Sequence, residues 1–148
     1  IIKDMQSAAQ GLGLQIHILR ASTDGELNAV FESLVRLQAG GLVIGGEPFF
    51  NSRSKELGAL SIQHAVPTIY QLPSFAAAGG LMSYGASLTD SYRLAGVYTG
   101  RILKGEKPSD LPIQRATKVE MIINLKTAKA LGLSIPLELL GRADEVIE

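Results

Sequence analysis

The residues with the clearest chemical potential follow a short apolar run, Leu-Val-Ile at residues 42–44, which glycines flank on both sides. An uninterrupted apolar run of this kind is typical of a strand buried on both faces of a parallel sheet, and we expect a central strand here. A chain that leaves the carboxyl end of such a strand enters the crevice where open α/β sheets bind ligands. The next residues predict one wall of a small-molecule site, because they combine flexible backbone, a carboxylate and two aromatic rings: Gly45, Gly46, Glu47, Phe49 and Phe50.

Two interpretations stay open for the side chains of this loop. Glu47 could meet an ammonium group of a ligand, or it could be a solvated carboxylate that the dipole of the following helix stabilises. Phe49 and Phe50 could stack on an apolar or aromatic ligand, but one of two such rings often packs under its own helix. We therefore expect one of the two rings in the cleft.

Further candidates follow the neighbouring strands. Tyr70, Gln71 and Phe75 come after an expected strand at residues 68–70 and should reach the same edge of the sheet, with Tyr70 partly in the core. Ser22, Thr23 and Asp24 precede a helix, and Thr23-x-x-Glu26 has the spacing of a capping box. Helix capping is therefore the better supported role for this trio, and ligand contact is the alternative.

Composition and motifs favour binding over catalysis. Fourteen basic residues balance fourteen acidic ones, so no net basic field is available to attract nucleic acid or an anionic membrane surface. The chain has no cysteine, and no spacing of metal ligands is present. His17 and His64 have no evident carboxylate or nucleophile partner, and the glycine pairs do not form a phosphate-binding motif. No catalytic residue, metal or cofactor is predicted.

The elements that must position these residues alternate along the first half of the chain. Apolar periodicity predicts a helix up to residue 12, a strand at 15–19, a helix over 23–37, the strand at 42–44, a helix from about 51 to 66 and the strand at 68–70. This alternation indicates a doubly wound α/β lobe. The chain opens on a helix although a βαβ unit needs a strand before it, so we expect a longer parent protein that supplies that strand.

The pattern changes after Phe75. A brief extended run at residues 81–84 precedes a helix over 88–103, and a long extended segment follows at 113–123. Asn124 is expected to cap another helix, and residues 142–148 to form a terminal turn or strand.

Several motifs from residue 67 onward resemble the carboxyl-terminal half of ABC transporter substrate-binding proteins, in particular the tryptophan- and phenylalanine-type amino-acid binders. They are Pro-Thr-Ile-Tyr at 67–70, Gly-Gly-Leu-Met-Ser-Tyr-Gly at 79–85, Ile-Leu-Lys-Gly at 102–105 with Lys-Pro-Ser-Asp-Leu-Pro at 107–112, Asn-Leu-Lys-Thr-Ala-Lys-Ala-Leu-Gly-Leu at 124–133 and Arg-Ala-Asp-Glu at 142–145. Each motif alone is common, and their combination is specific. The resemblance covers the whole chain.

The resemblance implies an α/β fold of the periplasmic-binding-protein type I class: a doubly wound parallel sheet lobe that belongs to a two-lobe protein. Residues 1–78 would be the second lobe, residues 79–112 a crossing and a first-lobe segment, and residues 113–148 the return crossing and the completion of the second lobe. Tyr84 and Ser83 would lie on the crossing, where they serve as hinge, ligand contact or interlobe packing. The rest of the first lobe would lie outside this chain.

The implied function is that of a periplasmic or membrane-anchored extracytoplasmic receptor that passes an amino acid or related compound to an ABC permease. A ligand-sensing effector domain of a LacI-like transcription regulator is the alternative, because the same lobes serve both roles. We also expect the open sheet edge of the fragment to pair with a copy of itself as a homodimer.

Overall fold

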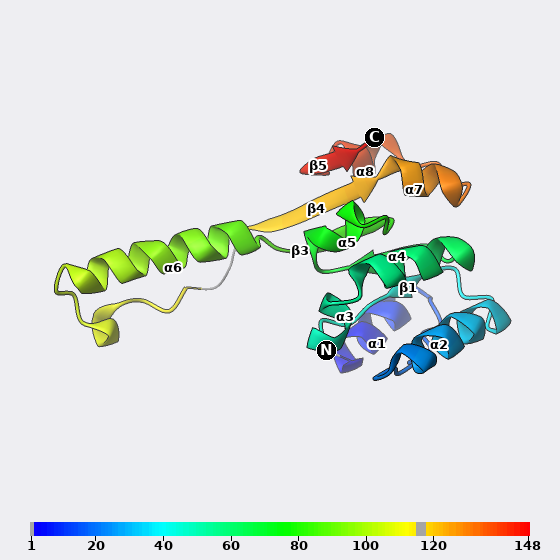
Figure 1. The fold of residues 1–148 in the computed structure, drawn as a ribbon, viewed down its shortest axis with the longest axis horizontal. Coiled ribbons are helices and arrows are strands. Elements are labelled where there is room, and N and C mark those ends of the chain that lie inside the picture. The colour runs from blue at the N-terminus through cyan, green and yellow to red at the C-terminus, as the bar shows by residue number, and fades with distance from the viewer. Residues whose placement is uncertain (1, 115–117) are drawn as a thin grey trace.

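The computed structural model describes residues 2–114 and 118–148, and it contains a five-stranded mixed sheet (Figure 1). The strands lie in the order of the chain: β1 (Leu42–Val43), β2 (Thr68–Tyr70), β3 (Met82–Ala86), β4 (Val119–Asn124) and β5 (Glu145–Ile147). β1, β2 and β3 are parallel, β4 runs antiparallel to β3, and β5 runs parallel to β4. The expected strands at 68–70 and at the carboxyl-terminal tail are confirmed.

Helices connect and flank these strands. Those of the first half are α1 (Ile2–Gly11), α2 (Asp24–Arg36), α3 (Pro48–Asn51), α4 (Ser54–Gln63) and α5 (Pro73–Ala77). The second half contains α6 (Leu88–Leu103), a 3₁₀ turn (Pro108–Asp110), α7 (Leu125–Ala130) and α8 (Leu137–Leu140). Asn124 caps α7 as expected, because its side chain accepts a hydrogen bond from the amide of Thr127.

The hydrophobic core lies between α2, α4 and the carboxyl side of β1 and β2. It consists of buried apolar and aromatic side chains from these elements, from the residues next to them and from α5, at Leu27, Phe31, Leu34, Ile44, Leu57, Leu60, Val66, Tyr70 and Phe75. The three core residues of α2 recur at helical spacing, as the periodicity of the sequence predicts. This cluster fixes the sheet relative to the helices, and so it fixes where the loops after β1 and β2 emerge.

Two strand predictions are corrected. The run at residues 42–44 is not a central strand: β1 ends the sheet, and Val43 is 58% exposed. Residues 15–19 form no strand. Both errors have one physical cause, since a strand needs a hydrogen-bonded neighbour. In the doubly wound order 2-1-3-4-5, another strand lies between these two segments, and no described residue takes that position.

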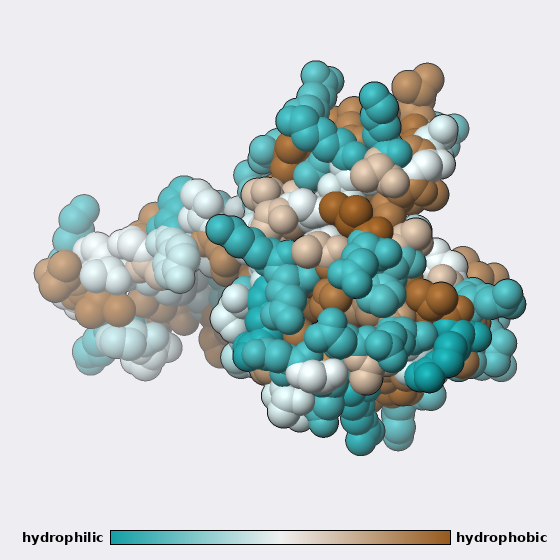
Figure 2. Space-filling view, turned by 45° about the vertical axis from the view of Figure 1, so that its right-hand side comes forward, coloured by the Kyte–Doolittle hydropathy of each residue, from teal (hydrophilic) through white to brown (hydrophobic). Residues whose placement is uncertain are grey.

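The helix predicted over residues 88–103 is confirmed as α6, and it projects away from the body that holds β1, β2 and α4 (Figure 1). None of its residues is buried. Figure 2 shows hydrophobic residues on the surface of this projecting arm, where Leu88, Val97, Ile102 and Leu103 are exposed. No helix among the described residues has both the length and the apolar character needed to cross a membrane.

The long extended segment predicted at 113–123 contains β4, which pairs along its length with β3. Residues 115–117 of that prediction lie outside the described residues. β3 and β4 together lead from the body to α6 and back (Figure 1). At the junction, the amide of Ser87 donates to the carbonyl oxygen of Lys118 at 2.9 Å, and the Ser87 hydroxyl caps α6.

Candidate functional site

The loops that follow β1 and β2 meet at one rim of the sheet. The side chain of Gln71, directly after β2, lies against the backbone of Gly46, directly after β1: a Cβ atom on Gly46 would fall 2.5 Å from Gln71 Nε2. Gly85 of β3 lies against the backbone carbonyl of Gln71, and a Cβ atom there would overlap it. The first contact is with the end of the Gln71 side chain, which can rotate, whereas the second is with backbone and requires glycine at residue 85. Together the two contacts bring three successive strands to a shared edge.

Glu47 occupies the position before α3 in an extended backbone conformation and is exposed. Its side chain makes no capping hydrogen bond to that helix. Pro48 follows at the first helical position, where its fixed φ angle suits the start of a helix. No hydrogen bond of the Glu47 side chain ties it to the helix start, and its contact with a ligand stays a prediction.

Phe49 and Phe50 are both half-buried and pack against the edge of the core. Their rings meet edge to face, with centroids 5.2 Å apart and planes at 71°. Neither ring is fully in the core, so which of the two faces a ligand stays a prediction. The two rings together form a partly exposed aromatic surface shortly after Glu47.

Tyr70 connects the core to this loop. Its ring is 1% exposed, and its hydroxyl donates to Asn51 Oδ1 and lies 3.5 Å from the carbonyl oxygen of Glu47. Burial raises the pKa of this hydroxyl, which is held as a neutral donor. Tyr70 therefore holds the loop from Glu47 to Asn51 onto the sheet.

The structure corrects the expectation that Phe75 reaches a ligand. Its ring is fully buried and meets the Tyr70 ring edge to face, with centroids 5.9 Å apart. Phe75 follows the end of β2 by five residues and lies in the short helix α5, which turns it back over the sheet. In this arrangement Phe75 and the Tyr70 ring shape the rim from beneath and offer no face to a ligand.

Tyr84 lies on β3 and is 58% exposed, opposite Met121 of β4. Its neighbour Ser83 points to the other side of the sheet and is buried, and its hydroxyl has no hydrogen-bond partner among the described residues. β3 continues past the end of β2, and Gly85 lies at the shared rim. Tyr84 directly precedes Gly85 and therefore lies near this rim. The position is open to a ligand or to a facing lobe.

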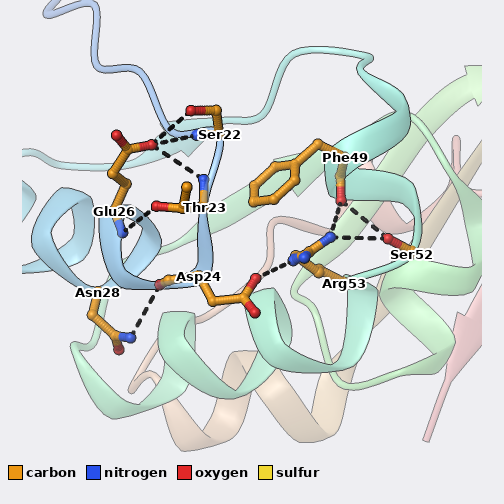
Figure 3. Close-up of polar contacts among 8 residues, drawn as sticks. All are labelled: Ser22, Thr23, Asp24, Glu26, Asn28, Phe49, Ser52 and Arg53. Carbon is orange, nitrogen blue, oxygen red and sulfur yellow. Dashed lines mark hydrogen bonds and ion pairs between the residues drawn. The ribbon is translucent and has the colours of Figure 1, made fainter.

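The capping role expected at the start of this helix is confirmed for Thr23, with Ser22 bonded beside it (Figure 3). Thr23 Oγ1 accepts from the amide of Glu26 at 3.3 Å, and the Glu26 carboxylate accepts from the amides of Ser22 at 2.7 Å and Thr23 at 3.1 Å. The hydrogen bond from the Ser22 amide lowers the pKa of Glu26, because it favours the charged carboxylate. Ser22 and Thr23 are therefore engaged at the start of α2, whereas the Asp24 carboxylate pairs with Arg53.

Arg53 is a residue of this region that the sequence analysis missed. Its guanidinium forms an ion pair with Asp24 of α2 and lies over the ring of Phe49, 3.9 Å from the ring centroid (Figure 3). The available signal was its place four residues after Phe49, the spacing at which side chains on a helical turn are neighbours.

Comparisons with solved structures identify the fold. The chain superposes on a conserved domain protein from Vibrio cholerae O1 biovar El Tor (TM-score 0.84, 19% identity, 98% of this chain and 49% of that one). It also superposes on an ABC domain in complex with L-Trp from Streptococcus pneumonia (TM-score 0.84, 21% identity, 99% and 49%). A ligand-free, open substrate binding protein with adhesive properties from Clostridium difficile is similar too (TM-score 0.72, 21% identity, 99% and 48%).

These likenesses confirm the predicted α/β fold of the periplasmic-binding-protein class. The chain spans about half the length of each of these proteins. No curated protein matches the sequence. A family model described as "ABC transporter substrate binding protein" matches residues 2–147, nearly the whole chain. The chain therefore belongs to the ABC transporter substrate binding protein family.

Proposed function

We propose that the natural full-length protein binds a small organic molecule, an amino acid or a related aromatic or branched compound, in a cleft between two lobes. The observation that carries this proposal is the shared rim at which Gly46, Gln71 and Gly85 meet, at the carboxyl ends of parallel strands, with Glu47 directly after Gly46. Open α/β sheets bind ligands at such a rim. Membership of a substrate-binding family supports the same role.

The chemistry of the rim supports an amino acid in particular. Glu47 provides an exposed carboxylate for an ammonium group, and Gln71 provides an amide that can orient a polar end of the ligand. Phe49 and Phe50 provide aromatic surface, with Tyr84 open on the neighbouring strand. The similar protein from Streptococcus pneumonia was solved with L-Trp bound. Tyr70 and Phe75 contribute by holding the loop and not by direct contact.

The proposed mechanism is closure of two lobes. Residues 1–78 belong to the second lobe, 79–112 cross to the first lobe and form part of it, and 113–148 return and complete the second lobe. The projection of α6 from the body, by way of the paired strands β3 and β4, supports this division (Figure 1). A ligand shifts such a protein to the closed state only through its higher affinity for that state, and no bond needs to break. The closed protein then presents a surface to an ABC permease in an extracytoplasmic compartment.

A calorimetric titration of the full-length protein against a panel of amino acids tests the ligand class. We expect at least one member to bind, and we expect Glu47→Ala to weaken its affinity about tenfold, since a charged hydrogen bond contributes about 1.5–3 kcal/mol. Glu138→Ala, which removes an exposed carboxylate on α8, should leave the affinity unchanged. The absence of heat with every member would exclude the amino-acid proposal, and an unchanged affinity in Glu47→Ala would exclude only the role of Glu47.

The outer edge of β1 supports a second, independent proposal about assembly. No strand among the described residues pairs with that edge, and exposed edges are templates for pairing with another chain. We expect the 148-residue chain on its own to form a homodimer through this edge. Sedimentation velocity at increasing concentration measures this, and a single monomeric species at the highest concentration would contradict it.

A further inference from the structure

We propose that Arg53 is a positioning residue for the ligand site: its guanidinium holds the Phe49 ring in one orientation and so makes the site selective for planar aromatic ligands over aliphatic ones. This inference rests on the proposed binding function and names the part of the ligand that this ring recognises.

The first support is the double contact between Arg53 and Phe49 (Figure 3). The guanidinium carbon lies 3.9 Å from the centroid of the Phe49 ring, and Nη1 of the same group donates to the Phe49 carbonyl oxygen at 3.1 Å. Nη1 also lies 3.2 Å from the Ser52 hydroxyl, which itself donates to the Phe49 carbonyl oxygen. Ring and backbone of Phe49 are therefore held by one planar group, which fixes the ring's orientation.

The second support is the anchor on the far side of the guanidinium. Nε of Arg53 donates to Asp24 Oδ1, across 29 positions of sequence. Asp24 is the first residue of α2, whose start is fixed by the capping box of Thr23 and Glu26. The Arg53 side chain is only 28% exposed, so its position depends on these contacts more than on water. The orientation of Phe49 is thus linked to the start of α2.

This arrangement decides which ligand group the ring can accept. One face of Phe49 is covered by a cation, and the edge contact with Phe50 restricts tilting of the ring. A second cation on the opposite face would be repelled by the first. The exposed remainder of the half-buried ring therefore favours a neutral aromatic group, while an ammonium group is directed to Glu47, two residues earlier.

An aromatic ligand depends on a fixed ring, because its stacking is directional, whereas aliphatic contact is not. The test is calorimetry of the full-length protein with L-tryptophan and L-leucine. Arg53→Ala should weaken L-tryptophan binding about fivefold, the size of one aromatic or cation–π contact, and L-leucine binding less than about twofold. Arg53→Lys keeps the positive charge but loses the planar, forked guanidinium. Its L-tryptophan affinity should therefore lie between that of Arg53→Ala and that of the unaltered protein.

Arg93→Ala is the matched control, since Arg93 pairs with Asp90 on the surface of α6. It should change neither affinity. Equal losses for both ligands in Arg53→Ala would show a merely structural role and overturn the inference, as would an unchanged preference for L-tryptophan. If the unaltered protein binds neither amino acid, the inferred selectivity for aromatic ligands is overturned, whereas the amino-acid proposal is decided by the whole panel. If Arg53→Ala does not fold, Arg53→Lys is tested in its place. In that variant the ratio of the L-tryptophan affinity to the L-leucine affinity should fall by about twofold.

Discussion

Replacement of Gly85 by alanine is expected to lower the free energy of unfolding by about 3 kcal/mol, the upper part of the range for overpacking a closely packed position. A Cβ atom at residue 85 would overlap the carbonyl oxygen of Gln71. This neighbour is backbone, so it cannot rotate away as the end of a flexible side chain can. Relief requires β3 to move from the loop after β2, and Gly85 is also paired with Glu120 of β4. The strain therefore reaches the ladder that leads to α6.

Urea denaturation measures this effect, and Gly96→Ala is its control. Gly96 lies in the middle of α6, and a Cβ atom there would have no neighbour within 4 Å. Because glycine in a helix is less favourable than alanine by about 0.5–1 kcal/mol, Gly96→Ala should stabilise the protein slightly. An unfolding midpoint of Gly85→Ala equal to that of the unaltered protein would show that the two strands can separate without cost. It would also remove the main evidence for a rigid shared rim.

Local structure was largely predictable from the sequence. The capping box of α2 follows from the spacing of Thr23 and Glu26, and both reciprocal hydrogen bonds are present. The strand β2 and the bounds of α6 also agree with the periodicity of their residues. These features depend on contacts within a few positions along the chain, and the residue types at those positions therefore carry the information.

Features that depend on distant partners were not predictable in the same way. The apolar run at 42–44 looks like a central strand, but whether a strand is central depends on which neighbours it has. The five-residue helix α5 is too short to show periodicity, and the only signal for it was Pro73 at its first position. Missing α5 led directly to the wrong prediction that Phe75 faces a ligand.

The candidate site likewise has features that the sequence predicts and features that depend on distant contacts. That the loops after β1 and β2 share a rim followed from the general geometry of parallel sheets. The contact of Gln71 with Gly46, however, is a packing detail across 25 positions of sequence, and the Arg53–Asp24 pair spans 29. Sequence reasoning identified Glu47 and the two phenylalanines as chemical groups, but it did not identify the residues that hold them in place.

The second large effect on stability is expected from substitutions at Phe75 and at Gly80, which packs against its ring. Phe75→Ala is expected to lower the free energy of unfolding by about 3–5 kcal/mol, since a fully buried ring leaves a cavity beside Tyr70. The loss should also weaken ligand binding, because Tyr70 holds the loop from Glu47 to Asn51. Thermal or urea unfolding measures the first effect and calorimetry the second.

A double-mutant cycle with Gly80→Ala separates packing from other causes. A Cβ atom on Gly80 would overlap the Phe75 ring, so Gly80→Ala alone should destabilise the protein by about 1–3 kcal/mol. In the Phe75→Ala background the ring is gone and the added methyl group enters the cavity, so the same substitution should cost little or become stabilising. We expect a coupling energy of about 1–2 kcal/mol in favour of the double variant. Additive losses would show that Gly80 is required for its backbone and not for the space that the ring occupies, and the rim would then owe its shape to the turn before β3.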